Sequence, residues 1–150
     1  MRSGTLPNWS IALLFVLSGA ATEVRSVPKA AWSLDEILSA VREVETGGEP
    51  DEGRRATGDG GLAIGPFQIH RAYWQDAGIR GAFEDCRDPE YARAVVLAYW
   101  RRYCPRALDE LEAEVLARVH NGGPRGARLE STLAFWCKVE RALEVDRGKP

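Results

Sequence analysis

Two acidic residues near the middle of the chain, Glu45 and Asp59, have the side chains and surroundings that cleavage of a glycosidic bond requires. Glu45 lies near the end of the segment VREVETGG, and Asp59 lies between glycines in GDGGLAIGPFQIHRAYW. Two carboxyl groups with separated pKa values can divide the chemistry, one protonating the leaving oxygen and the other stabilising or attacking the oxocarbenium-like centre. Glu45 is the candidate general acid, and Asp59 is the candidate second carboxylate.

Helix geometry favours Glu45 over its neighbour Glu43 as the acid that faces the interior. The apolar residues that recur at helical spacing are Leu34, Ile37, Leu38, Val41 and Val44. At about 100° per residue, Glu45 falls close to the centre of this stripe, whereas Glu43 falls on the far side, towards water. Apolar walls disfavour a charged carboxyl and raise its pKa, as a general acid near neutral pH requires. The alternative is a last-turn residue that bends out into solvent.

The assignment of Asp59 has a structural alternative, because an aspartate beside glycine most often serves turn geometry. The catalytic interpretation requires Asp59 to stand across a cleft from Glu45. Three other acids compete with it: Asp51 and Glu52 in the same loop, and Asp76 further along. The pattern of residues alone therefore leaves the second acid open.

The two histidines, His70 and His120, do not accompany a nucleophile motif, because the sequence contains no G-x-S-x-G turn. We interpret His120 as a helix-end residue that packs or caps near the cleft, with direct catalysis as the alternative. No two cysteines form a C-x-x-C pair, and so few histidines argue against a metal site. The sequence therefore predicts neither a metal ion nor a cofactor.

Helices must position these residues, and the first helix is marked at both ends. Ser33 and Glu36 form a capping box, in which each side chain accepts a hydrogen bond from the other residue's backbone N–H. Trp32 and Ile37 have the spacing of a hydrophobic staple around that cap. A glycine pair then ends the helix, so Glu45 is expected in its last turn.

Capping and turn signals predict further helices along the chain. Asp88 and Pro89 form an N-cap and a first turn, and the segment NGGP ends a later helix. The helices predicted after the first cover residues 71–77, 89–103, 107–119 and 132–143. No segment alternates over the length of a strand. The expected fold class is therefore α+β, mostly α-helical, with at most a small hairpin between residues 49 and 63.

The chain of 150 residues suggests one domain, preceded by a segment for export. Arg2 followed by the apolar run IALLFVLSGAA has the pattern of a secretory signal, and the run is shorter than the roughly 20 apolar residues that span a membrane. We expect a signal peptide at 1–21, a linker at 22–32 and a catalytic domain at 33–145. The expected location is secreted, extracellular or periplasmic, without stable membrane insertion after cleavage; a retained anchor or a buried N-terminal helix is the alternative.

The balance of charges argues against a nucleic-acid partner. With 20 basic and 22 acidic residues, the chain has a formal net charge of −2, and it lacks the basic excess of nucleic-acid binders. Arginines cluster at residues 101–106 and 118–128, where solvated helix faces or loops are expected. The oligomeric state is left open.

The three cysteines, Cys86, Cys104 and Cys137, are compatible with a disulfide in an exported chain and leave one thiol over. A continuous helix over residues 89–103 would hold its ends roughly 20 Å apart, whereas bridged Cα atoms lie within about 7 Å. Cys86 and Cys104 should therefore not pair. A bridge is expected to involve Cys137.

Three motifs in register resemble the invertebrate-type lysozyme family, which includes the destabilase-like lysozymes. VETGG is similar to the family's V-E-S-G, GPFQIHRAYWQDAG to G-P-F-Q-I-x-x-x-Y-W-x-D, and LARVHNGGPRG to R-I-H-N-G-G-P-x-G. The closing segment STLAFWCKVERAL is similar to the family's last aromatic helix. Together these motifs extend over roughly residues 34–143, and H-N-G-G-P is especially specific.

The resemblance implies a lysozyme-like fold and hydrolysis of the β-1,4 bond between N-acetylmuramic acid and N-acetylglucosamine in the glycan strands of peptidoglycan. It places the family's catalytic glutamate on Glu45 and its second acid on Asp59. The segment GGLAI departs from the serine- and cysteine-containing stretch of the family, and the loop differs slightly in length. The family is also usually disulfide-dense, whereas this chain has three cysteines.

The same resemblance implies a sugar cleft with two walls. The residues expected to form one wall are Gln68, Ile69, His70, Tyr73 and Trp74, and those expected opposite are His120, Asn121 and Gly122. Aromatic faces suit sugar rings, and amides can recognise N-acetyl groups. Core packing is the alternative for Tyr73 and Trp74, and we assign Trp100 and Trp136 to the core.

A looser similarity to goose-type lysozymes and soluble lytic transglycosylases leaves a second enzymatic interpretation open. Those families read E-S, G-L-M-Q-I and A-Y-N-x-G, and the counterparts here are Glu45 with Thr46, residues 65–69 and residues 119–122. A lytic transglycosylase cleaves the same bond with one acid and without water, leaving a 1,6-anhydro sugar, so this alternative depends on Asp59. A secreted glycan-binding domain without activity is the third interpretation.

Overall fold

The structure is a computed structural model that describes residues 32–148. The predicted signal peptide, residues 1–21, lies outside the described residues, as does the predicted linker except for its last residue, Trp32. Trp32 is buried and belongs to the hydrophobic core, so the described domain includes a residue that the prediction assigned to the linker. Within residues 32–148, no helix combines the length and the apolar character needed to cross a membrane.

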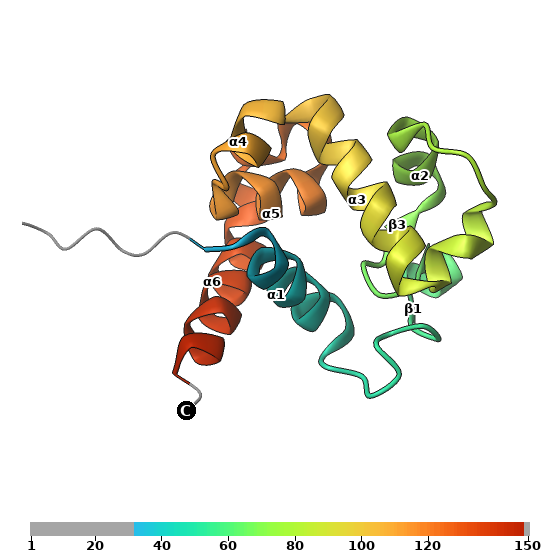
Figure 1. Ribbon diagram of the computed structural model, residues 1–150, viewed down its shortest axis with the longest axis horizontal. Helices are drawn as coiled ribbons and strands as arrows, with labels where there is room; N and C mark the ends of the chain where they lie inside the picture. Colours follow the sequence, from blue (N-terminus) through green and yellow to red (C-terminus); the bar gives the residue numbers. More distant parts are fainter. Residues whose placement is uncertain (1–31, 149–150) are drawn as a thin grey trace, which may run out of the picture.

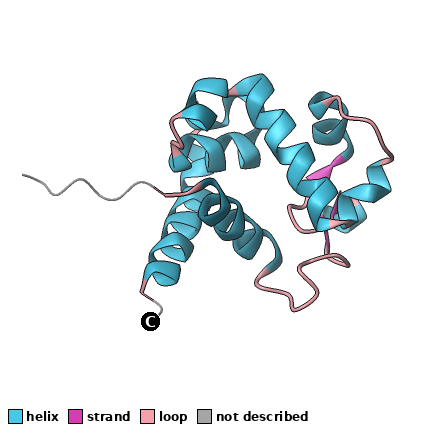
Figure 2. Ribbon diagram, in the orientation of Figure 1, coloured by secondary structure: helices cyan, strands magenta, loops and turns pink. Residues whose placement is uncertain are grey.

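Two groups of elements lie on either side of the helix α3, Pro89–Tyr103 (Figure 1). The helices on one side are α1 (Leu34–Thr46), α4 (Pro105–Asp109), α5 (Ala113–Gly122) and α6 (Leu133–Arg147). The other side contains the helix α2 (Arg71–Ala77), the 3-10 turn η2 (Phe83–Arg87) and a three-stranded sheet. Helices dominate the described chain, and the strands are short (Figure 2). The predicted α+β, mostly helical class is confirmed.

The apolar faces of the long helices meet in a core to which α1, α3, α5 and α6 contribute. Side chains buried in this core include Ile37, Val41, Val95, Trp100, Leu116 and Val139. Complete burial of a large apolar side chain contributes about 1.5–3 kcal/mol, so the core fixes how α1 and α5 face each other. Trp100 lies in the core as predicted, and Trp136 is partly buried against it.

The first helix begins and ends where its capping signals predicted. The Ser33 hydroxyl accepts a hydrogen bond from the Glu36 N–H at 3.2 Å, and the Glu36 carboxylate accepts one from the Ser33 N–H at 2.7 Å. Gly47 ends the helix in a left-handed conformation with φ 64°. Glu45 therefore lies in the last turn, where the helix opens into the following loop.

The single helix predicted over residues 107–119 is in fact two helices, α4 and α5. The chain breaks around Leu111, which has a left-handed backbone with φ 54°. The apolar pattern continues across the break because Leu108 of α4 and Leu116 of α5 are both buried in the same core, so periodicity alone could not reveal it. The NGGP segment ends α5 as predicted, with Gly123 as the C-cap.

The sheet is small and serves mainly to hold loops together. Its antiparallel strands are β1 (Thr57–Gly58), β2 (Ala63–Ile64) and β3 (Ile69–His70). The register pairs Gly58 with Ala63 and Ala63 with His70, and the 3-10 turn η1 (Asp59–Gly61) joins the first two strands. The small hairpin that the sequence allowed is formed by β1 and β2. β3 was not predicted, because two residues cannot display an alternating pattern.

The predicted disulfide is wrong, since all three cysteines are free thiols. Cys86 is a residue of η2 whose side chain is buried in the core, Cys104 is the C-cap residue of α3, and Cys137 is exposed on α6. These are three different environments, so Cys137 has no thiol partner. Burial raises the pKa of Cys86 to about 12 and that of Cys104 to about 11.

Gly65 provides a test of how the sheet is attached to the core. Its φ is +75°, and a Cβ there would collide with the backbone carbonyl of Cys86. We expect Gly65→Ala to lower the free energy of unfolding by about 2–5 kcal/mol, combining left-handed strain with overpacking. Gly60→Ala is the matched control, because Gly60 has φ +67° and nothing within 4 Å of an added Cβ. Urea unfolding that gave both variants the same loss would contradict this packing.

The thiol environments predict a clear order of reactivity. With a chromogenic disulfide reagent at neutral pH, Cys137 should react at once, Cys104 slowly, and Cys86 only after unfolding, because the thiolate is the reactive form. All three thiols should become titratable in denaturant without a reductant. Single Cys→Ser variants show which thiol gives rise to each kinetic phase of the modification. Fewer than three thiols in unreduced, denatured protein would contradict the unpaired arrangement.

Candidate active site

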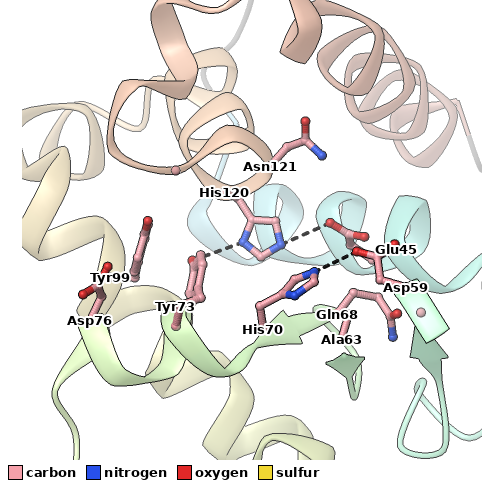
Figure 3. Close-up of a pocket in the computed structure, with 13 residues that line it drawn as sticks. Glu45, Asp59, Ala63, Gln68, His70, Tyr73, Asp76, Tyr99, His120 and Asn121 are labelled. Carbon is pink, nitrogen blue, oxygen red and sulfur yellow. Dashed lines mark hydrogen bonds and ion pairs between the residues drawn. The ribbon is translucent and has the colours of Figure 1, made fainter. Parts of the chain in front are cut away.

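A cavity of about 450 Å³ opens where the two groups of elements meet. Its lining comes from α1, the β1–β2 hairpin, the approach to β3, α2, α3 and α5. The lining residues are Glu45, Gly58, Asp59, Ala63, Gln68, His70, Ala72, Tyr73, Asp76, Tyr99, His120, Asn121 and Gly123. Both candidate acids are among them (Figure 3), so residues far apart in the sequence share one site.

Glu45 reaches the cavity from the last turn of α1, with its side chain 18% exposed. Its Oε1 lies 3.3 Å from Nε2 of His120 (Figure 3). Glu43, two residues earlier, is exposed and does not line the cavity. The difference follows from the apolar stripe of α1, which turns one face of the helix towards the core and brings Glu45 to its edge.

His120 is the buried centre of this wall, with its side chain 3% exposed. Its Nε2 lies 3.1 Å from the carbonyl oxygen of Phe67 and close to Glu45, and both of those partners are acceptors. Nε2 must therefore carry the proton in a neutral imidazole. Nδ1 then accepts a hydrogen bond from the Tyr73 hydroxyl at 3.2 Å.

Tyr73 is held from its other side by Tyr99. The two rings stack with centroids 3.6 Å apart and planes 12° from parallel. Burial raises the pKa of Tyr73 well above its ordinary value, and burial together with Tyr103 raises the pKa of Tyr99 to about 12. Both hydroxyls therefore stay protonated at neutral pH, which makes Tyr73 a permanent donor to His120.

Asp59 belongs to a more exposed wall than Glu45. It begins η1 with a left-handed backbone at φ 50°, and its side chain is 69% exposed. Its Oδ2 lies 2.8 Å from Nε2 of His70, the second residue of β3 (Figure 3). The two candidate acids are thus each paired with a histidine, one buried and one near the surface.

Gln68 joins the hairpin to the β2–β3 turn. Its backbone is left-handed, with φ 47°, and its amide donates to the Gly65 carbonyl at 2.9 Å. Its amide oxygen packs over Gly58, where any Cβ would collide with it. Gly58 thus has to remain a glycine for Gln68 to take its place in the cavity wall.

Several residues predicted for the cleft do line the cavity, and three others do not. The predicted residues in the lining are Gln68, His70, Tyr73, His120 and Asn121, beside the two acids. Ile69 is buried in the core, because neighbouring strand residues point to opposite faces. Trp74 turns away, and its Nε1 donates to the Tyr91 hydroxyl at 2.9 Å. Gly122 packs against Thr132.

Tyr99 and Asp76 line the cavity, although the sequence did not assign them to it. Tyr99 shared the helical spacing of core residues on α3 and gave no separate signal. Asp76 was weighed as a rival acid and occupies the last turn of α2; its backbone carbonyl accepts from Arg102 at 2.8 Å. The other rivals, Asp51 and Glu52, lie outside the cavity lining.

The chemistry of the lining is that of acids, amides and aromatic hydroxyls. It contains three carboxyl groups and no lysine or arginine. Within the part of the chain that the structure describes, no three histidine, cysteine or acidic side chains are arranged to hold a metal ion. The arrangement can therefore protonate a leaving group and stabilise positive charge with its own side chains, as glycosidic cleavage requires.

Known proteins share both the sequence and the fold of this chain. The profile of the destabilase family matches residues 36–142. The lysozyme of Meretrix lusoria is 39% identical over 84 residues, which cover 55% of this chain and 69% of that protein. The lysozyme of Ostrea edulis is 37% identical over 109 residues, covering 71% of this chain and 78% of that protein. The crystal structure of Tapes japonica lysozyme is similar with a TM-score of 0.60 at 31% identity, covering 71% and 87% of the two chains.

The tyrosine pair predicts how stability depends on alkaline pH. A tyrosine whose folded pKa is about 12 and whose unfolded pKa is about 10 keeps its proton better in the folded state. The stability it contributes is present below pH 10 and is lost as pH rises towards 12. We expect Tyr99→Phe to make the unfolding free energy fall less steeply over this interval than in the wild type. Parallel curves for the two proteins would contradict the assignment.

Proposed function

This chain belongs to the destabilase family of invertebrate-type lysozymes, and on that premise we propose that it cleaves the β-1,4 bond between N-acetylmuramic acid and N-acetylglucosamine in peptidoglycan. Family membership makes it a glycoside hydrolase of the lysozyme type. The observation that carries the proposal is the meeting of Glu45 and Asp59 in one cavity, although they come from different elements. A pair of carboxyl groups beside one binding cavity is the arrangement that this reaction uses.

Glu45 acts in this proposal as the general acid that protonates the leaving glycosidic oxygen. Oε1 of Glu45 lies 3.3 Å from Nε2 of His120, whose N–H is shared with the Phe67 carbonyl. When Glu45 gives up its proton it becomes an anion, and the nearby N–H dipole of His120 attracts that anion more strongly than the neutral acid. His120 thereby stabilises the developing carboxylate more than the starting acid, which is the differential interaction that accelerates a reaction.

Asp59 is the second carboxylate, which stabilises the oxocarbenium-like centre or attacks it. A separation of about 5 Å between the two carboxyl groups in the complex with substrate would give retention through a glycosyl-enzyme intermediate. Gln68 and Asn121 supply amides for the N-acetyl groups, and His70 and Tyr73 complete the lining.

The partner of the enzyme is the glycan strand of peptidoglycan, and the proposed place of action is outside the cytoplasm. The signal pattern at residues 1–21 supports export. Export would place the enzyme either in the periplasm or in the extracellular medium.

A lytic transglycosylase is the second candidate reaction, and the exposure of Asp59 is the observation that favours it. That reaction needs a single acid, which Glu45 supplies, and it closes a 1,6-anhydro ring instead of adding water. The products separate the two reactions. Mass spectrometry of digested peptidoglycan should show reducing ends from hydrolysis, and anhydro ends would assign the chain to transglycosylation.

Replacing the proposed acid tests the reaction directly. We expect Glu45→Gln to reduce lysis of bacterial walls by about 100-fold or more, the usual scale of general acid catalysis, while binding to insoluble peptidoglycan persists. Glu43→Gln is the matched control, because Glu43 is a glutamate of the same helix that lies outside the cavity. Turbidity of a cell suspension measures lysis, and pull-down measures binding. Unchanged lysis by Glu45→Gln would refute the role of this acid. A wild-type protein that binds peptidoglycan without lysing walls would instead support the interpretation as a glycan-binding domain without activity.

A further inference from the structure

We propose that His70 is a positioning residue for the reaction, which holds the Asp59 carboxylate in its working orientation. The proposal rests on the proposed function of Asp59 and deepens it. The direct observation is the 2.8 Å contact between His70 Nε2 and Asp59 Oδ2, which joins two residues that are 11 positions apart in the sequence. In that contact Nε2–H donates and the carboxylate accepts.

The register of the sheet creates this contact. Gly58 pairs with Ala63, and Ala63 pairs with His70, so the three residues form one row across the strands. Asp59 follows Gly58 directly. The other two residues of the row, Gly58 and Ala63, have only a hydrogen atom and a methyl group as side chains, so they leave the imidazole room to reach the carboxylate.

Asp59 needs such a restraint because its own surroundings provide little. Its side chain is 69% exposed, and the backbone is left-handed at three successive residues, with φ of 50°, 67° and 94° for Asp59, Gly60 and Gly61. A Cβ added to either glycine would meet nothing within 4 Å, so no neighbouring atoms press on the turn there. The hydrogen bond from His70 holds the Asp59 carboxylate in a rotamer that packing does not fix.

The same geometry distinguishes positioning from substrate binding. Nε2 of His70 is already committed to Asp59, so the imidazole acts on the sugar through the carboxylate. Loss of a positioning residue lowers the rate of the bound complex, whereas loss of a binding residue raises KM. Truncation of His70 should therefore appear mainly in kcat.

Two substitutions can isolate the hydrogen bond from the rest of the side chain. A lysine at position 70 keeps an N–H donor for the Asp59 carboxylate, whereas an alanine removes it. Arg71, the next residue along the chain, is paired with Glu84 at 3.3 Å and offers a control outside this contact.

The test compares His70→Ala and His70→Lys with the wild type on a soluble glycan of alternating N-acetylmuramic acid and N-acetylglucosamine. We expect His70→Ala to lower kcat about five- to tenfold with little change in KM, the scale of one exposed hydrogen bond to a charged group. His70→Lys, which keeps a donor for the Asp59 carboxylate, should recover most of the lost kcat. Arg71→Ala is the matched control, since it removes an exposed ion pair beside His70 but outside the cavity.

Three results would overturn the proposal: an unchanged kcat in His70→Ala, a change confined to KM, or a His70→Lys protein no faster than His70→Ala. Circular dichroism and thermal unfolding of the same proteins identify any loss caused by misfolding. If His70→Ala misfolds, the kcat of His70→Lys decides, because a value far below that of the wild type would refute rescue by a donor at this position. The Glu45→Gln variant separates failure of the proposed function from failure of the positioning role. If Glu45→Gln still lyses bacterial walls, the proposed function is refuted. If Glu45→Gln is inactive and His70→Ala is fully active, only the positioning role of His70 is refuted.

Discussion

The burial of one imidazole constrains the whole site. His120 has only 3% of its side chain exposed, so its two nitrogens must find partners within the protein. An unsatisfied buried polar group costs about 1–3 kcal/mol, and the partners come from three different segments: Glu45, Phe67 and Tyr73. Satisfying this ring brings the end of α1, the turn before β3 and the helix α2 against α5.

The two candidate acids, Glu45 and Asp59, are held in the cavity wall by different kinds of structure. Glu45 is held by a helix whose apolar face is locked into the core, and by a histidine that is itself buried. Asp59 sits on a glycine-rich turn and is held across a two-residue sheet by an exposed histidine. The first arrangement fixes its carboxyl group through packing in the core, whereas the second relies on one hydrogen bond near the surface.

Sequence reasoning worked where a structure is determined by neighbouring residues. The capping box of Ser33 and Glu36 and the N-cap at Asp88 are local hydrogen bonds, so they marked helix ends correctly. The break between α4 and α5 at Leu111 was not predicted. The left-handed backbone of this leucine depends on the surrounding fold, and it does not interrupt the helical spacing of apolar residues in the sequence. Pairing of cysteines depends on distances between elements, which a sequence does not contain.

The candidate site shows the same limit of prediction from sequence, most clearly in the segment QIHRAYW. Glu45 could be chosen over Glu43 because the angle around a helix follows from residue number alone. The block QIHRAYW was predicted to line the cleft almost whole, yet adjacent residues of a strand face opposite sides, and adjacent residues of a helix lie about 100° apart. His70 and Tyr73 therefore reach the cavity, while Ile69 and Trp74 pack elsewhere. The placement of β3 and α2 against the core decides which member of each pair faces the cavity, and the register of β3 with Ala63 is what brings His70 to Asp59.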